Sequence, residues 1–182
     1  MRRALSETPH GNILVFLPGM REIRETQALL ENVDALVLAL HGDLPIEMQD
    51  LIFSPTEKRR VVLATSIAKT SLTLPDTRVV IDGGFRRAPR FDAATGLTRL
   101  ETVRISRAAA QQRAGRAGRE GPGTAVRLWT EAMHRGLSTF DPPEILTADL
   151  SPLVMHFALW RDATDSDDAR RVSFTGASSG RC

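Results

Sequence analysis

Three arginines recur every three residues in segment 111–119, QQRAGRAGR. On a helix, a step of three residues turns by about 60°, so these side chains gather near one face. Glycines at 115 and 118 keep that face clear of side-chain bulk, although each costs a helix roughly 1 kcal/mol relative to alanine. An arginine pair can neutralise the charge that builds on a phosphoryl group during its transfer. The segment therefore predicts a phosphate-directed site. A generic arginine-rich helix on nucleic acid is the alternative, but it does not require fixed glycines.

The same arginines belong to a longer basic block. From Phe85 to Arg119 the sequence has nine arginines, no lysine and two acidic residues, in a chain of 182 residues whose formal net charge is only +2. Guanidinium groups present a planar fork that binds phosphate in a bidentate way. The block favours a phosphate-rich partner, although a solvated basic face would have the same composition.

Short apolar runs alternate with amphipathic stretches in the first half of the chain. They predict strands at 13–17, 36–40, 61–64 and 79–82, and helices at 20–32 and 45–52. Because the runs show no polar alternation, they are typical of parallel strands that helices cover on both faces. The expected fold class is therefore α/β.

A different pattern follows Gly83. Segments 86–91 and 97–104 flank a glycine-containing loop and predict a β-hairpin. Ser106 is the expected N-cap of a helix that reaches about Arg116. A strand at 124–129 and an apolar-striped helix at 151–160 complete the expected elements. Segment 161–182 has little apolar content and no periodicity, so we expect it to be disordered or foreign to the fold.

Several blocks, in order, resemble the conserved motifs of DEAH-box helicases of superfamily 2. QRAGRAGR resembles motif VI, LVFLPG at 14–19 resembles motif IV, and ATSIAKTSLTL at 64–74 resembles motif V. LHGDLP at 40–45 resembles a further conserved block. The hairpin region and PEIL at 143–146 are similar to the bacterial HrpB type. Because several blocks match in order over about residues 11–160, coincidence is improbable.

The resemblance implies a RecA-like parallel sheet with helices on both faces and a protruding β-hairpin, namely the second motor domain of an ATP-dependent RNA helicase. Gln112, Arg116 and Arg119 match residues that face the γ-phosphate of ATP held by a first RecA-like domain. Ser71 matches a serine that senses the nucleotide state, and Asp82 matches a residue near the ribose. Phe53 stands where relatives stack a ring on adenine, and a core phenylalanine is an equal alternative there.

An RNA-binding groove is also implied by the resemblance. Thr65 and Ser66 match positions that touch the RNA backbone, and hydroxyls are suitable phosphate donors. Four hairpin arginines suit a groove for single strands, with ordinary surface exposure as the competing interpretation of each: Arg86, Arg87, Arg90 and Arg99. The family usually has asparagine where Ser66 stands and glutamate where Lys69 stands. These departures put the coupling between the RNA and nucleotide sites in question.

The sequence also bounds what this chain can do. It has no G-x-x-x-x-G-K-[ST] loop and no Asp-Glu-x-His block, which in the family hold ATP and Mg²⁺ in the preceding domain. We therefore expect the chain alone to be inactive and to be a truncated part of a longer helicase. We divide it into an extension (1–10), the RecA-like domain (11–146), a helix towards further domains (147–160) and a tail (161–182).

The remaining predictions concern metal binding, membrane contact, oligomeric state and location in the cell. The four histidines lack metal-ligand spacing and the single cysteine is the last residue, so no metal site is expected. Without a long apolar run or a signal pattern, we expect no membrane contact and a cytoplasmic monomer. Two other functions stay open: a noncatalytic nucleic-acid-binding module or truncated remnant, and a different superfamily 2 motor such as a viral-type helicase or DNA translocase. The hairpin block disfavours the last.

Overall fold

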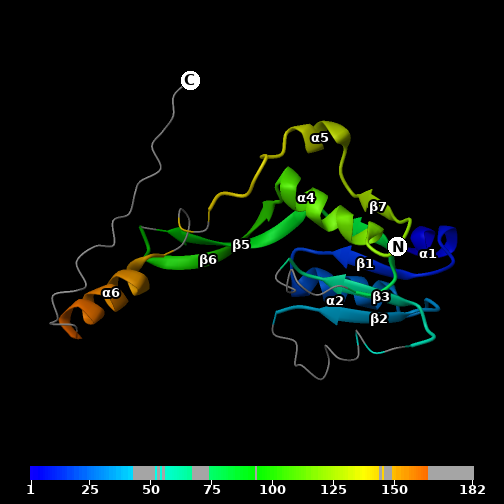
Figure 1. Ribbon diagram of the computed structural model, residues 1–182, viewed down its shortest axis with the longest axis horizontal. Helices are drawn as coiled ribbons and strands as arrows, with labels where there is room; N and C mark the ends of the chain where they lie inside the picture. Colours follow the sequence, from blue (N-terminus) through cyan, green and yellow to red (C-terminus); the bar gives the residue numbers. More distant parts are fainter. Residues whose placement is uncertain are drawn as a thin grey trace.

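A parallel five-stranded sheet forms the centre of the computed structural model, which describes residues 1–42, 52, 54, 56–66, 74–92, 94–143, 145 and 149–163. The strand order is β2-β3-β1-β4-β7, and every neighbouring pair is parallel (Figure 1). The strands are β1 (Asn12–Phe16), β2 (Leu36–Leu40), β3 (Arg60–Ala64), β4 (Thr77–Asp82) and β7 (Thr124–Arg127). The α/β fold class expected from the apolar runs is confirmed.

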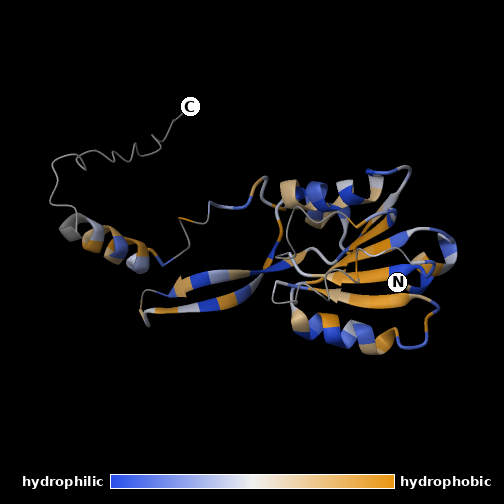
Figure 2. Ribbon diagram, turned by 60° about the horizontal axis from the view of Figure 1, so that its bottom comes forward, coloured by the Kyte–Doolittle hydropathy of each residue, from blue (hydrophilic) through white to orange (hydrophobic). Residues whose placement is uncertain are grey.

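Alternate residues of the central strands enter two separate core layers. In β1, Ile13 and Val15 pack on one side with α2 (Met20–Leu29) and α1 (Arg2–Glu7), whereas Leu14 and Phe16 belong to the layer on the other side. Strand side chains alternate between faces, so a strand that is buried on both sides must be apolar throughout. Figure 2 shows this as nearly continuous hydrophobic colour along the central strands. Helices on both faces of the sheet are therefore confirmed.

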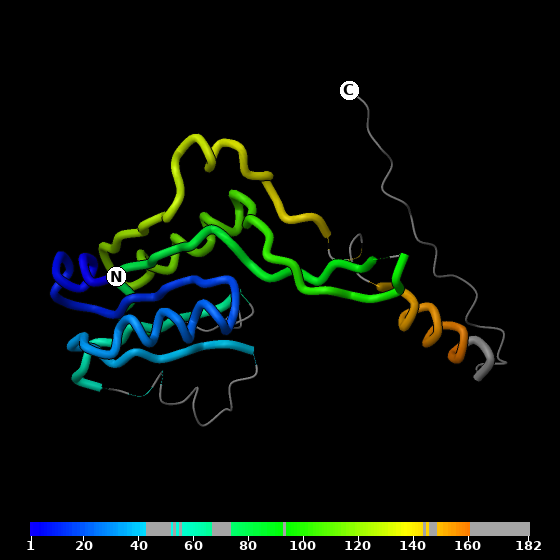
Figure 3. Tube along the Cα trace, turned by 180° about the vertical axis from the view of Figure 1, so that it is seen from behind, coloured from blue at the N-terminus to red at the C-terminus, as the bar shows by residue number. Residues whose placement is uncertain are grey.

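The hairpin leaves the sheet and extends away from it. It consists of β5 (Phe85–Asp92) and β6 (Leu97–Arg104), paired antiparallel from Phe85 opposite Arg104 to Asp92 opposite Leu97 (Figure 3). The Asp92 side chain stabilises the connecting turn, because its carboxylate accepts hydrogen bonds from the Ala94 backbone N–H and the Thr95 hydroxyl. The protruding β-hairpin predicted from the sequence is confirmed.

The helix after the hairpin changes its winding at a glycine. α4 (Arg107–Ala114) begins at Ser106, whose hydroxyl accepts a hydrogen bond from the Ala109 N–H at 3.1 Å, as an N-cap does. The chain continues as a 3₁₀ helix, η1 (Gly115–Gly118). Ala110 and Ala117 are buried, at 1% and 3% exposure, and hold both segments against the protein interior. The expected helix is confirmed, but its last turn is tighter than an α-helix.

Three further helices complete the described chain. α1 lies within the segment that we set apart as an extension, and its Met1, Ala4 and Leu5 pack against the core. α5 (Glu131–Arg135) was not predicted, and α6 (Ser151–Ala163) lies beyond the hairpin turn (Figures 1 and 3). The predicted helix at 45–52 falls, except for Ile52, outside the described residues, as does most of the predicted tail. Within the described part, no helix is long and apolar enough to span a membrane.

Candidate functional site

The candidate site lies at the edge of the sheet where the parallel strands end. Phe16, Ala64 and Asp82 are the last residues of β1, β3 and β4, and they are in register with one another across the sheet. Ligands of open α/β sheets bind outside this carboxyl edge, because the connecting loops and helix ends converge there. α4 and η1 pack on β4. α4 brings Arg113 to the carboxyl edge, whereas the chain after η1 reaches the start of β4, where the Asp76 N–H donates to Glu120 Oε2.

Arg113 is the centre of a buried network at this edge. Its Nη1 donates to Asp82 Oδ1 at 2.6 Å, and its Nη2 donates to Ser66 Oγ at 2.5 Å and to the Phe85 carbonyl at 3.3 Å. The guanidinium carbon also lies 4.7 Å from the centre of the Phe16 ring. Arg113 is 6% exposed and Asp82 is 3% exposed, so the fold encloses the pair.

The other two arginines face outwards. Arg116, in η1, is partly buried, and Arg119, which follows η1, is exposed. Burial lowers the pKa of the Arg116 guanidinium, and the nearby positive charge of Arg119 lowers it further. The like charge of Arg119 therefore disfavours the charged form of Arg116, and an anion near both guanidinium groups would offset that repulsion. Our expectation that all three arginines share one face is wrong for Arg113, which lies on the buried side of the segment with Ala110 and Ala117.

Within the described residues, neither backbone conformation nor packing requires glycine at positions 115 and 118. A Cβ atom added to Gly115 or Gly118 would meet none of the described atoms within 4 Å, and neither residue has a positive φ. Gly84 differs, because it has a φ of +78° and a Cβ there would lie 2.8 Å from the Trp129 ring. The open space beside Gly115 and Gly118 is suited to a group that approaches from outside the described chain.

The structure places the other predicted nucleotide residues as follows. Gln112 is exposed on the last turn of α4, beside the arginine patch. Asp82 is buried, and its Oδ1 accepts from both Arg113 and the Gly84 N–H. This structural task accounts for an aspartate at position 82 by itself, so its place near a ribose stays a prediction. Ser71 and Phe53 lie outside the described residues.

The predicted RNA-binding residues divide into two groups. Thr65 and Ser66 follow β3 directly and lie at the carboxyl edge, Thr65 buried and Ser66 partly exposed. At the hairpin base, Arg86 lies 3.4 Å from Asp141 and Arg87 lies 3.8 Å from Glu22, so these arginines also fasten the hairpin to the fold. Further out, two exposed arginines stand directly opposite each other across the hairpin, Arg90 and Arg99.

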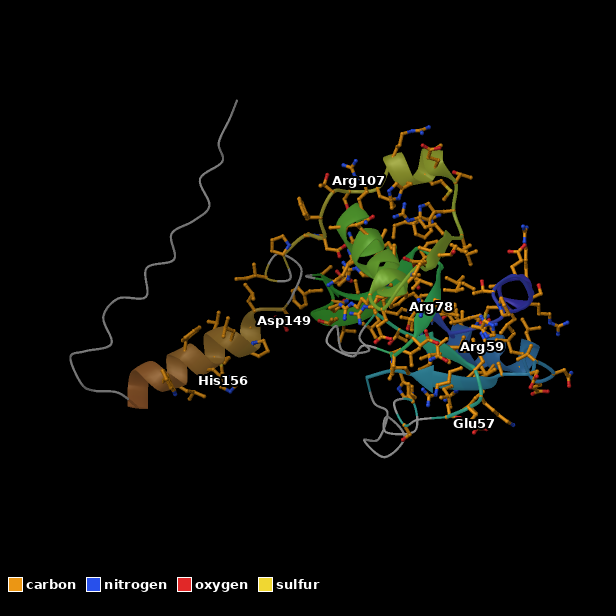
Figure 4. The ribbon with its side chains drawn as sticks, turned by 45° about the vertical axis from the view of Figure 1, so that its right-hand side comes forward. Glu57, Arg59, Arg78, Arg107, Asp149 and His156 are labelled. Atoms are coloured by element: carbon orange, nitrogen blue, oxygen red, sulfur yellow. The ribbon has the colours of Figure 1, made fainter. Side chains whose placement is uncertain are left out.

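The opposite edge of the sheet has a structural role. Arg59, just before β3, donates to the carbonyls of Gly11 at 2.6 Å and Leu5 at 3.0 Å, and burial lowers its pKa. Arg78, near the start of β4, forms an ion pair with Asp76 at 2.8 Å. Figure 4 labels both arginines on the sheet, away from α6, which carries His156. These contacts tie α1 and the strand starts together.

The parallel sheet with its protruding hairpin is the fold of a RecA-like helicase domain. Two crystal structures of *Escherichia coli* HrpB are similar to this chain, with TM-scores of 0.76 and 0.79 at 41% and 42% identity. The matches cover 88% and 87% of this chain, and 20% and 21% of the solved chains. The profile of the helicase conserved C-terminal domain matches residues 1–121. The chain belongs to this family, as the second RecA-like domain of a DEAH-box RNA helicase.

Curated relatives agree with this assignment. The chain is 43% identical over 155 residues to the ATP-dependent RNA helicase HrpB of *Escherichia coli* (strain K12), a match that covers 82% of this chain and 19% of that protein. It is 42% identical over 160 residues to the pre-mRNA-splicing factor ATP-dependent RNA helicase DEAH10 of *Arabidopsis thaliana*, covering 82% and 22% of the two chains. The chain thus spans about a fifth of the length of these relatives.

Sequence reasoning missed the role of Arg113. It noted this arginine as one of three at equal spacing but assigned it no contact, and the spacing contains no sign that one of the three turns inwards. The available signal was indirect: Asp82 directly follows the apolar run 79–81 of β4, and a buried carboxylate needs a charged or hydrogen-bonding partner.

Proposed function

We propose that this domain supplies arginine fingers to ATP bound by a first RecA-like domain. The observation that carries the proposal is the patch formed by Arg116 and Arg119, on a 3₁₀ turn with open space beside both of its glycines. The pKa of Arg116 is already lowered by burial and by Arg119, so a γ-phosphate between them relieves an existing repulsion. The two guanidinium groups then neutralise charge that develops on the phosphoryl group as it leaves.

Other residues support this role. Gln112, exposed one turn before Arg116, is placed to orient the γ-phosphate or the attacking water. We assign Ser71 to sensing of the nucleotide state, Asp82 to the neighbourhood of the ribose and Phe53 to stacking on adenine. Mg²⁺ enters with ATP and is held by the first domain. No residue of this chain is assigned to the metal.

The carboxyl edge of the sheet contributes part of an RNA groove in this proposal. Thr65 and Ser66 offer hydroxyls to the backbone of a single strand, and the hairpin extends a basic surface beyond them. Among the hairpin arginines, we assign the main RNA contacts to Arg90 and Arg99. Arg90 stands opposite Arg99 and forms an ion pair with Glu101 at 3.3 Å, and a phosphate near the two arginines would offset the repulsion between them. Arg86 and Arg87 act at the hairpin base, where they also hold acidic partners.

The working unit is therefore the two motor domains together. Closure on ATP brings Arg116 and Arg119 against the γ-phosphate, and opening after hydrolysis changes the grip on RNA. We propose that the protein acts in the cytoplasm without forming oligomers. An RNA substrate is preferred because the relatives are named RNA helicases.

The decisive experiment reconstitutes the ATPase from two parts. A separately expressed first motor domain of a close relative is mixed with this chain, and RNA-stimulated phosphate release is measured. We expect Arg116→Ala to lower the restored rate by about 10³-fold, since arginine fingers contribute on this order. Its melting temperature should stay close to that of the unchanged chain, because Arg116 is only partly buried.

Arg107→Ala is the matched control. Arg107 lies at the start of α4, where its guanidinium reaches the Thr139 hydroxyl at 2.7 Å, away from the glycine-flanked turn (Figure 4). We expect this variant to retain most of the restored rate. If Arg116→Ala is as active as Arg107→Ala, the finger assignment fails, and a noncatalytic nucleic-acid-binding module becomes the better interpretation.

A further inference from the structure

Arg113 connects three parts of the molecule that the sequence keeps far apart. Its guanidinium contacts Asp82 at the end of β4, Ser66 after β3 and the Phe85 carbonyl at the first residue of the hairpin. These contacts span 31, 47 and 28 residues along the chain. Arg113 itself lies in α4, one turn before Arg116. A single side chain thus links the arginine-finger segment to the proposed RNA edge.

The contact with Ser66 determines what the serine hydroxyl can do. Arg113 Nη2 donates to Ser66 Oγ at 2.5 Å, so the oxygen acts as the acceptor. A hydroxyl that accepts on its oxygen still has its own proton to donate, and a cationic donor polarises that O–H bond. Ser66 is partly exposed whereas Arg113 is buried, so the remaining proton can point only towards groups other than Arg113. An anionic oxygen such as an RNA phosphate is a suitable acceptor.

We infer that Arg113 is a positioning residue for RNA binding, which acts through Ser66. It holds the Ser66 hydroxyl in the donor orientation and fixes the hairpin base against the same sheet edge. Asp82 orients Arg113, because its Oδ1 accepts from Nη1 and leaves Nη2 free to serve Ser66 and Phe85. A shift of α4 therefore moves the Ser66 hydroxyl with it. This inference rests on the proposed contact between Ser66 and RNA.

A double-mutant cycle on this chain tests the inference. Binding of a fluorescent single-stranded oligouridine is measured by anisotropy for the unchanged chain, Ser66→Ala, Arg113→Lys and the double variant. Lysine keeps the charge beside Asp82 but lacks the planar fork that serves two acceptors at once. We expect each single variant to weaken binding by about tenfold, as for a lost hydrogen bond to a charged group. The affinity of the double variant for the oligouridine should be less than about twofold below that of Arg113→Lys.

The outcomes separate the two claims. If Ser66→Ala binds RNA as the unchanged chain does, the proposed Ser66 contact fails, and the positioning role fails with it. Suppose instead that Ser66→Ala weakens RNA binding and the double variant loses about a hundredfold in affinity, the product of the two single losses. The Ser66 contact is then supported and the positioning role of Arg113 is overturned. A merely structural effect of Arg113 gives this multiplicative result.

A second pair of substitutions controls for a loss of stability in Arg113→Lys. If Arg113→Lys melts far below the unchanged chain, the cycle is repeated with Arg113→Gln combined with Asp82→Asn, which removes both buried charges together. Ser66→Ala on that neutral background must again cost less than about twofold in RNA affinity. A cost of about tenfold on that background contradicts the inference.

Discussion

At the scale of single residues, equal spacing conceals unequal roles. Arg113, Arg116 and Arg119 repeat at intervals of three, yet the first is enclosed in an ion pair and the last is exposed. Breaking a buried pair leaves an uncompensated charge, whereas an exposed arginine can be removed at little cost to stability. Arg113 is therefore coupled to folding, whereas Arg116 and Arg119, which are partly buried and exposed, are the two that we propose as arginine fingers.

The glycines give a prediction at the same scale. Gly115 has φ −62° and ψ −9°, which any residue adopts, and a Cβ there meets open space. We expect Gly115→Ala and Gly118→Ala to keep or slightly raise the melting temperature, because alanine restricts the unfolded chain by about 0.4–1 kcal/mol. The same variants should lower the reconstituted ATPase rate by at least tenfold, since the added methyl obstructs the incoming nucleotide.

Gly84→Ala is the contrasting variant. Its positive φ of +78° and the nearby Trp129 ring make a Cβ costly there, so the melting temperature should fall. Full ATPase activity in Gly115→Ala and Gly118→Ala would show that no group approaches these glycines closely.

At the scale of elements, the hairpin depends on its turn. The pKa of Asp92 is lowered first by the hydrogen bond from the Thr95 hydroxyl and then by that from the Ala94 backbone N–H. A carboxyl whose pKa is lower in the folded state adds stability above its unfolded pKa of about 3.9. That contribution is lost as the pH falls through the folded value. The turn should therefore loosen in acid while the sheet stays intact.

An NMR titration measures this effect. We expect the amide signals of Ala94 and Thr95 to move with an inflection below about pH 3.9, the ordinary value for aspartate. Asp92→Ala should abolish the inflection and speed amide exchange in the hairpin, with little change in the melting temperature. Thr98→Ala, another hairpin threonine, is the control and should keep the inflection. An inflection at or above pH 3.9 in the unchanged chain contradicts the assignment.

At the scale of the whole molecule, the chain offers one side of a site. Arg113 and Ser66 meet at the carboxyl edge of the sheet, Arg116 and Arg119 follow further along the same segment, and no phosphate-binding loop occurs in the sequence. In our proposal, RNA is bound mainly through backbone contacts, which release counterions and weaken as salt increases. ATP hydrolysis is then expected only when the two motor domains are in contact.

Two measurements on the isolated chain test this description. Phosphate release from ATP should not exceed the background, with or without RNA. The affinity for single-stranded RNA should fall by about tenfold or more between about 50 and 200 mM salt, as for three or four phosphate contacts. Hydrolysis by the isolated chain that survives repeated purification would contradict the first expectation. A salt-independent affinity would contradict the second.

The sequence by itself determined most of the framework. The apolar runs predicted all five strands of the sheet, and the boundaries of β2 agree at both ends. The hairpin and the Ser106 cap followed from local turn and capping chemistry, which a few neighbouring residues specify. Strand 124–129 was predicted too long, since β7 ends at Arg127, and α5 was missed because five residues are too short for a periodic signal.

Only the tertiary structure decided which arginine turns inwards. Periodicity specifies the angles between side chains on a helix, but not how the helix is rotated against the sheet. That rotation follows from packing: Ala110 and Ala117 are buried, which directs Arg113 to Asp82 and leaves Arg119 exposed. Arg113 contacts Ser66 and Phe85, which are 47 and 28 positions away in the sequence. Contacts over such separations cannot be predicted from the pattern of neighbouring residues.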